Sequence, residues 1–453
     1  MMDKMTEEQK AHDIITRLCR AGWEAYIAGG AARDILDGEL PSDYDVVTNA
    51  PHEHVLELFR DRKVSIVGLS FKICIVDGIE VASYRKDGSF GHEDSSCVTE
   101  KAESIYEDLS RRDLTINAMA FCPYNGDVVD PFGGQADLKN RIIRFTGNPW
   151  DRISEDPCRI VRACRFKAKL KGTFDPVSLE AMKERASTVA QVAPERLRLE
   201  LLKAMACEKP SLFFNALHET GVLGYISPGL EACYGHDGGD YHGETIDEHV
   251  AIVGDALSGK KPLLRLAGYF HDMGKPPTAE YHDNKLSFIS HEKTGALMVA
   301  EELKALKFSL KETDYVTALV RHHMRRIEAE DKPKTVRRVL KKLKDDDVNW
   351  KDWLRLIIAD AKGNLKKEDF SREQIRGIVM KIHHELYPPS GRSALTVFDL
   401  AINGNDVMAA LGFREGPEIG RVLNRVLEFV LDDPERNTRE RLLEYVNNLD
   451  NDQ

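Results

Sequence analysis

Residues 26–48 read YIAGGAARDILDGELPSDYDVVT, and this stretch predicts a strand, a glycine turn, a short helix and a second strand. Residues 26–28 form a short apolar run of strand type. The adjacent Gly29 and Gly30 permit positive φ and leave the backbone bare toward a ligand. The short helix expected over 32–36 points its first N–H groups into the same space, which suits an anion such as a phosphate.

Two aspartates follow this turn on the strand expected over 42–47. Asp43 and Asp45 are two positions apart, so on a strand they share one face. Two carboxylates beside a phosphate-binding turn suit a pair of Mg²⁺ ions about 3.5–4 Å apart, as used in phosphoryl and nucleotidyl transfer. Each half alone is more often an ordinary turn or a solvated acidic pair; their order along the chain favours the catalytic interpretation.

Composition limits the class of protein. The 453 residues allow two to four domains, and 42% are hydrophobic and 31% charged, as in ordinary globular proteins. We see no apolar run long enough to span a membrane and no secretory leader. The eight cysteines form no CxxC pair, so we expect reduced core residues in a cytoplasmic protein. The net charge of −11 argues against nonspecific nucleic-acid binding, although basic groups can gather on one face.

The chain is predicted to be α+β at its start and helical afterwards. Short β-rich runs over 63–68, 71–76 and 79–84 predict a small mixed sheet, where Glu80 is either a third metal carboxylate or a surface residue. The polar stretch 86–101 predicts a mobile loop, and strand signals stop after about residue 153. We place domains at 1–150, 151–230, 231–388 and 389–453, with the glycine-rich stretch 221–243 as the clearest boundary.

Two charged motifs are expected on helices. Arg111 and Arg112 offer planar forks that match phosphate oxygens, Asp113 can accept from a ribose hydroxyl, and Asn117 lies one turn on. In EDPCR (155–159), we expect an i, i+3 pair. Asp156 would accept from an exocyclic amino group of the base, and Arg159 would donate to the adjacent ring nitrogen. Cytosine and adenine present this pair of groups, whereas uracil and guanine do not. The alternative is a plain intrahelical ion pair, and for Glu195 and Arg196 structural ion pairs are our preferred interpretation.

With these stretches placed, the first half of the chain resembles the class II tRNA nucleotidyltransferases, the CCA-adding enzymes and their bacterial poly(A) polymerase relatives. The resemblance rests on GGAARD with DYD, RRD, DPFGGQADL, EDPCR and ERLRLE, in that order. It implies a polymerase-beta-like head for catalysis and a helical neck for nucleotide choice. Asp43 and Asp45 would be catalytic and hold Mg²⁺. The implied nucleotide-binding residues are Gly29, Gly30, Arg33, Arg111, Arg112, Asp113, Asn117, Glu155, Asp156, Arg159 and Arg162. A full-length loop before RRD favours an enzyme that can add the terminal adenosine.

The second helical part carries a histidine and aspartate pattern that resembles the HD phosphohydrolase superfamily. A His-Asp pair with one His before it and one Asp well after it can hold a divalent metal. The candidate metals are Ni, Mn, Fe and Co. The expected ligands are His249, His271, Asp272 and Asp360. His291 and one of His322 or His323, of which we assign His322, are candidates for a second ion or the substrate phosphate. An active site of this kind would hydrolyse phosphoesters such as a 2′,3′-cyclic or 2′-phosphate.

Together these features predict template-independent addition of CCA to the 3′ end of tRNA from CTP and ATP. One alternative is an A-adding enzyme or a poly(A) polymerase, and another is an HD phosphohydrolase whose N-terminal part only binds nucleotide. The basic run 332–344 is either a solvated helix face or a phosphate-binding surface, and the tail glycines Gly412, Gly416 and Gly420 resemble a turn near a nucleic-acid backbone. We expect no membrane partner, and either a monomer or a homodimer.

Overall fold

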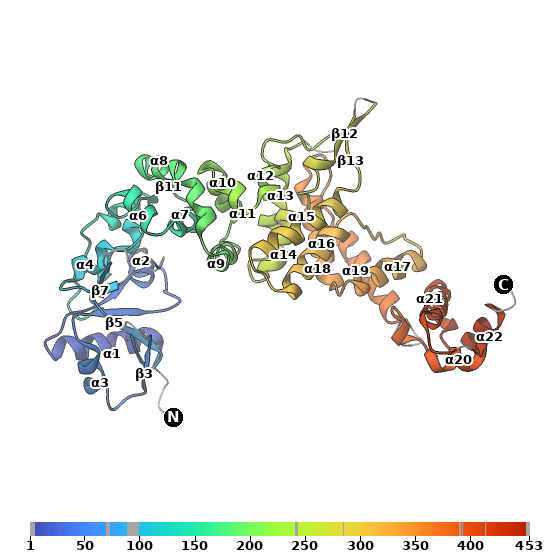
Figure 1. Cartoon of the computed structure of the whole chain (residues 1–453), viewed down its shortest axis with the longest axis horizontal. Helices are drawn as coiled ribbons and strands as arrows, with labels where there is room; N and C mark the ends of the chain where they lie inside the picture. The colour runs from blue at the N-terminus through green and yellow to red at the C-terminus, as the bar shows by residue number, and fades with distance from the viewer. Residues whose placement is uncertain are drawn as a thin grey trace. The chain divides into compact units, whose positions relative to one another are not determined.

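The computed structural model describes residues 5–68, 73–87, 99–240, 243–283, 285–388, 391, 393–412 and 414–449. Contacts divide the chain into two compact units, Met1–Ile226 and Ser227–Gln453 (Figure 1). The finer division into four domains stays a prediction. Residues 88–98 of the loop predicted over 86–101 lie outside the described part of the chain. His242 also lies outside it. β6 (Arg85–Asp87) and β7 (Thr99–Lys101), which flank residues 88–98, pair antiparallel.

The first unit is built on a seven-stranded mixed sheet in the order β3-β4-β5-β2-β1-β8-β9. Its centre is β1 (Ala25–Ala28), β2 (Asp45–Thr48) and β5 (Ile79–Ser83). β2 and β5 pair in parallel and the other neighbours are antiparallel. The flanking strands are β3 (Val64–Val67), β4 (Ile73–Val76), β8 (Ala120–Phe121) and β9 (Val128–Val129). The mixed sheet expected from the sequence is confirmed.

Side chains alternate between the two faces of this sheet. Ile27 and Val46 pack in the core cluster that includes α1 (Glu7–Arg20) and Val55 of α3 (His52–Leu58). Ala28 and Val47 pack in the other cluster, which includes α4 (Ile105–Ser110). Asp45 has the same parity as Val47, so it points to the α4 face. A capping box opens α1, because Thr6 Oγ1 accepts from Gln9 N and the Gln9 side chain accepts from Thr6 N.

The rest of the first unit is helical. The helices are α5 (Gly134–Lys139), α6 (Pro149–Glu155), α7 (Cys158–Leu170), α8 (Pro176–Glu184), α9 (Pro194–Ala204), α10 (Ser211–Glu219) and α11 (Leu223–Ile226). The expectation of no strand after residue 153 is wrong in this unit at β11 (Thr173–Phe174), which pairs in parallel with β10 (Ile142–Ile143). Gly172 allows this pairing because a Cβ there would collide with the Arg141 carbonyl.

The second unit is largely helical, as predicted. Its principal helices are α13 (Ile246–Ala256), α14 (Pro262–Phe270), α15 (His291–Ala305), α16 (Leu310–His322), α17 (Pro333–Asp345), α18 (Trp350–Gly363), α19 (Arg372–Leu386), α20 (Gly404–Leu411), α21 (Pro417–Asp432) and α22 (Arg439–Leu449). Gly412 ends α20 in the left-handed conformation and Gly416 precedes α21, while Gly420 lies inside that helix. No helix in the described ranges is long and apolar enough to cross a membrane.

One hairpin interrupts the helices of the second unit and was not predicted. β12 (Ala279–His282) and β13 (Lys285–Phe288) pair antiparallel between α14 and α15. Asp283 follows β12 with a φ of 50°, a conformation that aspartate tolerates in tight turns. Asp283 was the available sequence signal, because aspartate is common in turns.

Candidate active sites

The glycine turn lies between β1 and α2 (Gly30–Leu36), which begins two residues earlier than the sequence predicts. Gly29 has φ 72° and ψ −127°, a region that side-chain-bearing residues rarely adopt. A Cβ at Gly29 would lie 2.6 Å from Nη1 of Arg112. The turn therefore requires glycine both for its backbone and for the guanidinium that packs against it.

Three carboxylates line one cleft, but β2 begins at Asp45, so the prediction that Asp43 and Asp45 lie together on a strand is wrong. Asp43 lies in the turn before β2, Asp45 is the first residue of that strand, and Glu80 on β5 is the register partner of Asp45. Burial, together with the charges of Asp43 and Glu80, raises the pKa of Asp45 above its ordinary value. Because divalent cations prefer oxygen ligands and would relieve this repulsion, the group fits Mg²⁺. Glu80, whose role the sequence left open, lies in the cleft.

Asp108 holds the two arginines of the RRD motif. Its side chain is 1% exposed; Oδ1 accepts from Arg111 Nε and Nη2 at 3.3 Å and Oδ2 accepts from Arg112 Nη2 at 3.1 Å. Oδ1 also accepts from the backbone N–H of Arg85, the first residue of β6, at 3.0 Å. The prediction that RRD lies on a helix is wrong, because α4 ends at Ser110 with Arg111 as its C-cap. Arg111 and Arg112 instead follow the last residue of α4 in a turn, where both bond to Asp108.

Asp113, Asn117, Arg33 and Arg162 form one hydrogen-bonded group. Asp113 is buried and accepts from Asn117 Nδ2 at 3.0 Å and from Arg162 Nε at 2.8 Å. Although burial opposes its charge, Arg162 and Asn117 hold the pKa of Asp113 below its usual value. Arg33 donates to Asn117 Oδ1, and its guanidinium lies 4.9 Å from the Phe166 ring centroid. These contacts orient residues from α2, α7 and the turn after α4 along one wall.

The EDPCR motif is not one continuous helix. α6 ends at Glu155, Asp156 is extended, and α7 begins after Pro157. Proline disfavours helix at the residue before it, which explains the break. The expected Asp156–Arg159 pair is absent from the described contacts: Arg159 donates to Glu155, whereas Asp156 receives both terminal nitrogens of Arg196 at 3.0 and 2.6 Å. Asp156 and Arg159 nevertheless both line the cleft, and their role as a base template stays a prediction.

Most of these groups line one cleft of about 790 Å³ in the first unit. Arg33, Asp108 and Glu155 are not among its lining residues; they bond to lining residues, Arg33 to Asn117, Asp108 to Arg111 and Arg112, and Glu155 to Arg159. Its basic side chains are Arg85, Arg111, Arg112, Arg159, Arg162, Arg165, Arg196 and Lys203. Its acidic side chains are Asp43, Asp45, Glu80, Asp113 and Asp156, of which Asp113 pairs with Arg162 and Asp156 with Arg196. In a chain of net charge −11, this concentration of positive charge matches a polyphosphate, with the carboxylates suited to its cations.

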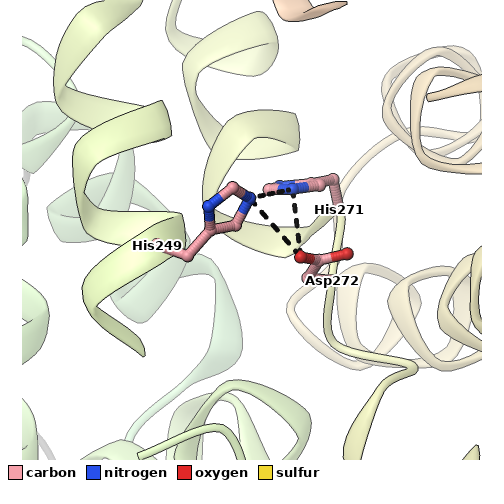
Figure 2. Close-up of side chains that lie close together, drawn as sticks. All are labelled: His249, His271 and Asp272. Carbon is pink, nitrogen blue, oxygen red and sulfur yellow. Dashed lines mark hydrogen bonds and ion pairs between the residues drawn. The ribbon is translucent and has the colours of Figure 1, made fainter. Parts of the chain in front are cut away.

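The second unit contains a buried cluster of histidines and aspartates. Figure 2 shows His249 of α13 meeting His271 and Asp272 at the end of α14. His249 Nε2 lies 3.2 Å from His271 Nε2 and 3.5 Å from Asp272 Oδ2, and Asp360 Oδ1 on α18 lies 3.2 Å from His249 Nε2. The four groups that we expected to bind one metal are therefore together.

Asp272 also faces a second set of ligands. Its Oδ1 lies 3.3 Å from His291 Nε2 and 3.5 Å from His323 Nε2. The assignment of His322 to this set is a mistake: its Nε2 bonds to Asp346 Oδ2 at 2.8 Å, on the opposite side of the helix end. Of the two adjacent histidines, the structure brings His323 and not His322 to Asp272.

The outer ring nitrogens fix the imidazoles in place. The Nδ1 atoms of His271, His291 and His323 bond to the carbonyls of Gly268, Phe288 and Val320 at 2.8, 2.8 and 2.6 Å. His249 Nδ1 lies 3.3 Å from the Glu244 carboxylate. Such partners leave each Nε2 directed inward, which is how proteins orient metal-binding histidines.

Two cations balance the buried carboxylates of this cluster. Lys275 Nζ lies 2.7 Å from Asp272 Oδ2, and Arg326 Nη2 lies 2.6 Å from Asp360 Oδ2. Although burial opposes the charge, His271 and Lys275 hold the pKa of Asp272 well below its usual value. A cavity of about 620 Å³ opens onto the cluster and is also lined by Lys367 and Phe370.

Three family models match the chain in succession. They are the poly(A) polymerase head domain over residues 25–144, the probable RNA and SrmB-binding site of polymerase A over 173–234, and the HD domain over 241–355. The chain is 36% identical to a CCA-adding enzyme of Geobacillus sp. (strain WCH70), over 48% of this chain and 54% of that protein. It is 34% identical to poly(A) polymerase I of Salmonella typhi, over 51% and 52%.

The chain belongs to the tRNA nucleotidyltransferase and poly(A) polymerase family. It matches about half the length of these curated relatives. Within the family, identity to CCA-adding enzymes and to poly(A) polymerases is similar, so sequence likeness leaves the two activities unresolved.

Solved structures of family members share the fold over nearly the whole chain. A Bacillus stearothermophilus CCA-adding enzyme in complex with CTP matches with a TM-score of 0.69 at 24% identity, covering 99% of both chains. A Thermotoga maritima CCA-adding enzyme complexed with tRNA_CCA matches with a TM-score of 0.58 at 18% identity, covering 100% of this chain and 97% of that one. The predicted fold of a mixed-sheet head followed by largely helical parts is confirmed.

Proposed function

We propose that this protein adds CCA to the 3′ end of tRNA without a template, using CTP and ATP. The observation that carries the proposal is the cleft of the first unit. There, three carboxylates and several arginines line the same cleft as the glycine turn. Cation-binding and polyphosphate-binding groups therefore share one space, as transfer of a nucleotide from a triphosphate requires.

In the reaction we propose, the tRNA 3′-oxygen bonds to the α-phosphorus of the nucleotide, and the bond from that phosphorus to pyrophosphate breaks. Asp43 and Asp45 would hold Mg²⁺, which neutralises charge on the phosphate oxygens when bound. Gly29 and Gly30 leave room for the triphosphate against the backbone, and Arg112 supplies hydrogen bonds beside them. Asp113 and Asn117, which line the cleft, would contact the ribose, and Asp156 and Arg159 the base.

The base selection that we expected from Asp156 and Arg159 needs one rearrangement. Asp156 is held by Arg196 and Arg159 by Glu155, so each must exchange its partner for the base. Asp156 and Arg159 are both charged, so each keeps a charge-assisted hydrogen bond when the base takes the place of Arg196 or Glu155 as its partner.

The decisive experiment uses three tRNA transcripts that lack one, two or three 3′ residues, each incubated with one labelled nucleoside triphosphate. CCA addition predicts cytidine on the two shorter transcripts, adenosine only on the transcript ending in CC, and no further extension. An A-adding enzyme would label only the transcript ending in CC. A poly(A) polymerase would extend every transcript with many adenosines.

A second candidate activity comes from the histidine and aspartate cluster of the second unit. The inward Nε2 atoms fit a divalent transition metal, and Lys275 and Arg326 beside them suit a phosphate. We propose a phosphohydrolase acting on 2′,3′-cyclic or 2′-phosphate ends. Hydrolysis of 2′,3′-cyclic AMP with added Ni²⁺ or Mn²⁺ tests it: Asp272→Asn should abolish hydrolysis and leave nucleotide addition intact, and Asp43→Ala should do the reverse.

A further inference from the structure

A groove of about 520 Å³ lies in the second unit, outside the histidine and aspartate cluster. The end of α17, the start of α18 and the end of α19 form its walls. Leu340 and Leu343, which are 2% and 1% exposed, lie at its base. No residue is shared between this groove and the cavity over the cluster, so the proposed activities leave it unexplained.

Aromatic rings line one side of the groove. Tyr387 is 54% exposed, and its ring centroid lies 5.0 Å from that of His383 at an interplanar angle of 44°. Trp350 lies at the start of α18 and is partly exposed. Large exposed aromatic side chains lose hydration favourably when a flat partner covers them. The groove therefore presents ring surface in addition to its apolar floor.

Lysines stand next to these rings. Lys344 and Lys351 are exposed, and neither has a carboxylate partner among the residues that the structure describes. Lys351 Nζ lies 5.6 Å from the Trp350 ring centroid. Asp347 is the acidic side chain in the described lining. Lys334 and Lys342 on α17 and Lys332 at its N-cap are also exposed.

We propose that this groove binds one unpaired nucleotide of the RNA substrate, with its base against Tyr387 and its phosphates at Lys344 and Lys351. Stacking on aromatic rings beside lysines is how proteins bind single-stranded nucleic acid without reading sequence. An acidic peptide would use the lysines but has no flat group for the rings. The inference takes RNA as the partner from the proposed function, and otherwise rests on the groove alone.

Equilibrium binding of a tRNA transcript lacking its last nucleotide, measured with the full chain over a salt series, tests the proposal. Tyr387→Ala should weaken binding between about five- and a hundredfold, while Tyr387→Phe keeps the ring and should bind like the wild type. Lys344→Ala and Lys351→Ala should each lower the slope of log K against log salt by about 0.7–0.9. Lys304→Ala, an exposed lysine in the last turn of α15, is the matched control.

Binding and turnover separate this proposal from the proposed function. Wild-type RNA binding that depends on the groove, without nucleotide addition, would leave the groove standing and refute the enzyme activity. Nucleotide addition with unchanged affinity and salt slope in all the groove variants would overturn the groove and point to a protein partner there. Thermal melts of Tyr387→Ala and Tyr387→Phe guard against unfolding; if the alanine variant unfolds, the lysine slopes decide.

Discussion

Replacing Asp108 by asparagine should disable the arginine wall of the cleft while keeping its shape. The carboxylate is 1% exposed and accepts from both Arg111 and Arg112. Asparagine keeps one acceptor oxygen but turns an N–H₂ donor toward a guanidinium. A hydrogen bond to a charged group contributes about 1.5–3 kcal/mol, and the arginine side chains are 28% and 19% exposed, so solvent recovers part of the loss. We expect the first unit to lose about 2 kcal/mol of unfolding free energy.

Activity should fall further than stability explains. Arg112 is the guanidinium packed against Gly29, so releasing it removes an oriented donor beside the triphosphate site. We expect kcat/KM for the nucleotide to fall about 10- to 100-fold, at ~1.4 kcal/mol per tenfold, with KM for tRNA unchanged.

Asp61→Asn is the matched control for Asp108→Asn, because Asp61 pairs with Arg17 at the surface, where its side chain is 55% exposed. Urea unfolding and steady-state kinetics at saturating tRNA would measure both effects. Wild-type kcat/KM in Asp108→Asn, together with a folded protein, would refute the argument that this carboxylate positions the arginines.

Three other substitutions test separate parts of the two sites. Gly29→Ala should abolish nucleotide addition, because the added Cβ meets Arg112 and the positive φ is strained; isothermal titration with CTP and Mg²⁺ should show no binding. The raised pKa of Asp45 means that the folded protein holds that proton more tightly than the unfolded chain, so stability is lost as pH rises through this pKa. In a pH series, Mg²⁺ should therefore raise Tm more where Asp45 is ionised than where it is protonated, and Asp45→Asn should remove most of that difference; a Mg²⁺ effect that stays constant along the series contradicts the assignment. His323→Ala should lower bound Mn²⁺ or Ni²⁺ by about one ion per chain in elemental analysis, whereas His322→Ala should leave it unchanged.

The local parts of the fold could be predicted because their determinants are local. The strands around Ile27 and Val46 alternate between two cores, and the Thr6 capping box opens its helix as its sequence requires. The sequence also indicates the break at Asp156, because Pro157 disfavours helix at the residue before it. The i, i+3 spacing of Asp156 and Arg159 predicts a continuous helix instead, and that prediction is wrong. The β12–β13 hairpin similarly carried a turn signal at Asp283.

The remaining differences depend on residues far apart in sequence. Asp156 bonds to Arg196, forty positions away, and no local pattern identifies that partner. The choice between His322 and His323 depends on how α16 is rotated against α14 and α15, which tertiary packing determines. The sequence does not predict the role of Asp108, because a single acid in a charged helix has no distinguishing spacing.

The internal neutralisation of the histidine and aspartate cluster bears on how this protein matures. Lys275 and Arg326 already compensate Asp272 and Asp360, so the polypeptide need not await an ion before it closes around these acids. In that respect it differs from zinc fingers, whose chains collapse only when loaded. The metal proposed for this cluster could therefore enter after the chain has folded, and a chelator should remove it without unfolding the protein.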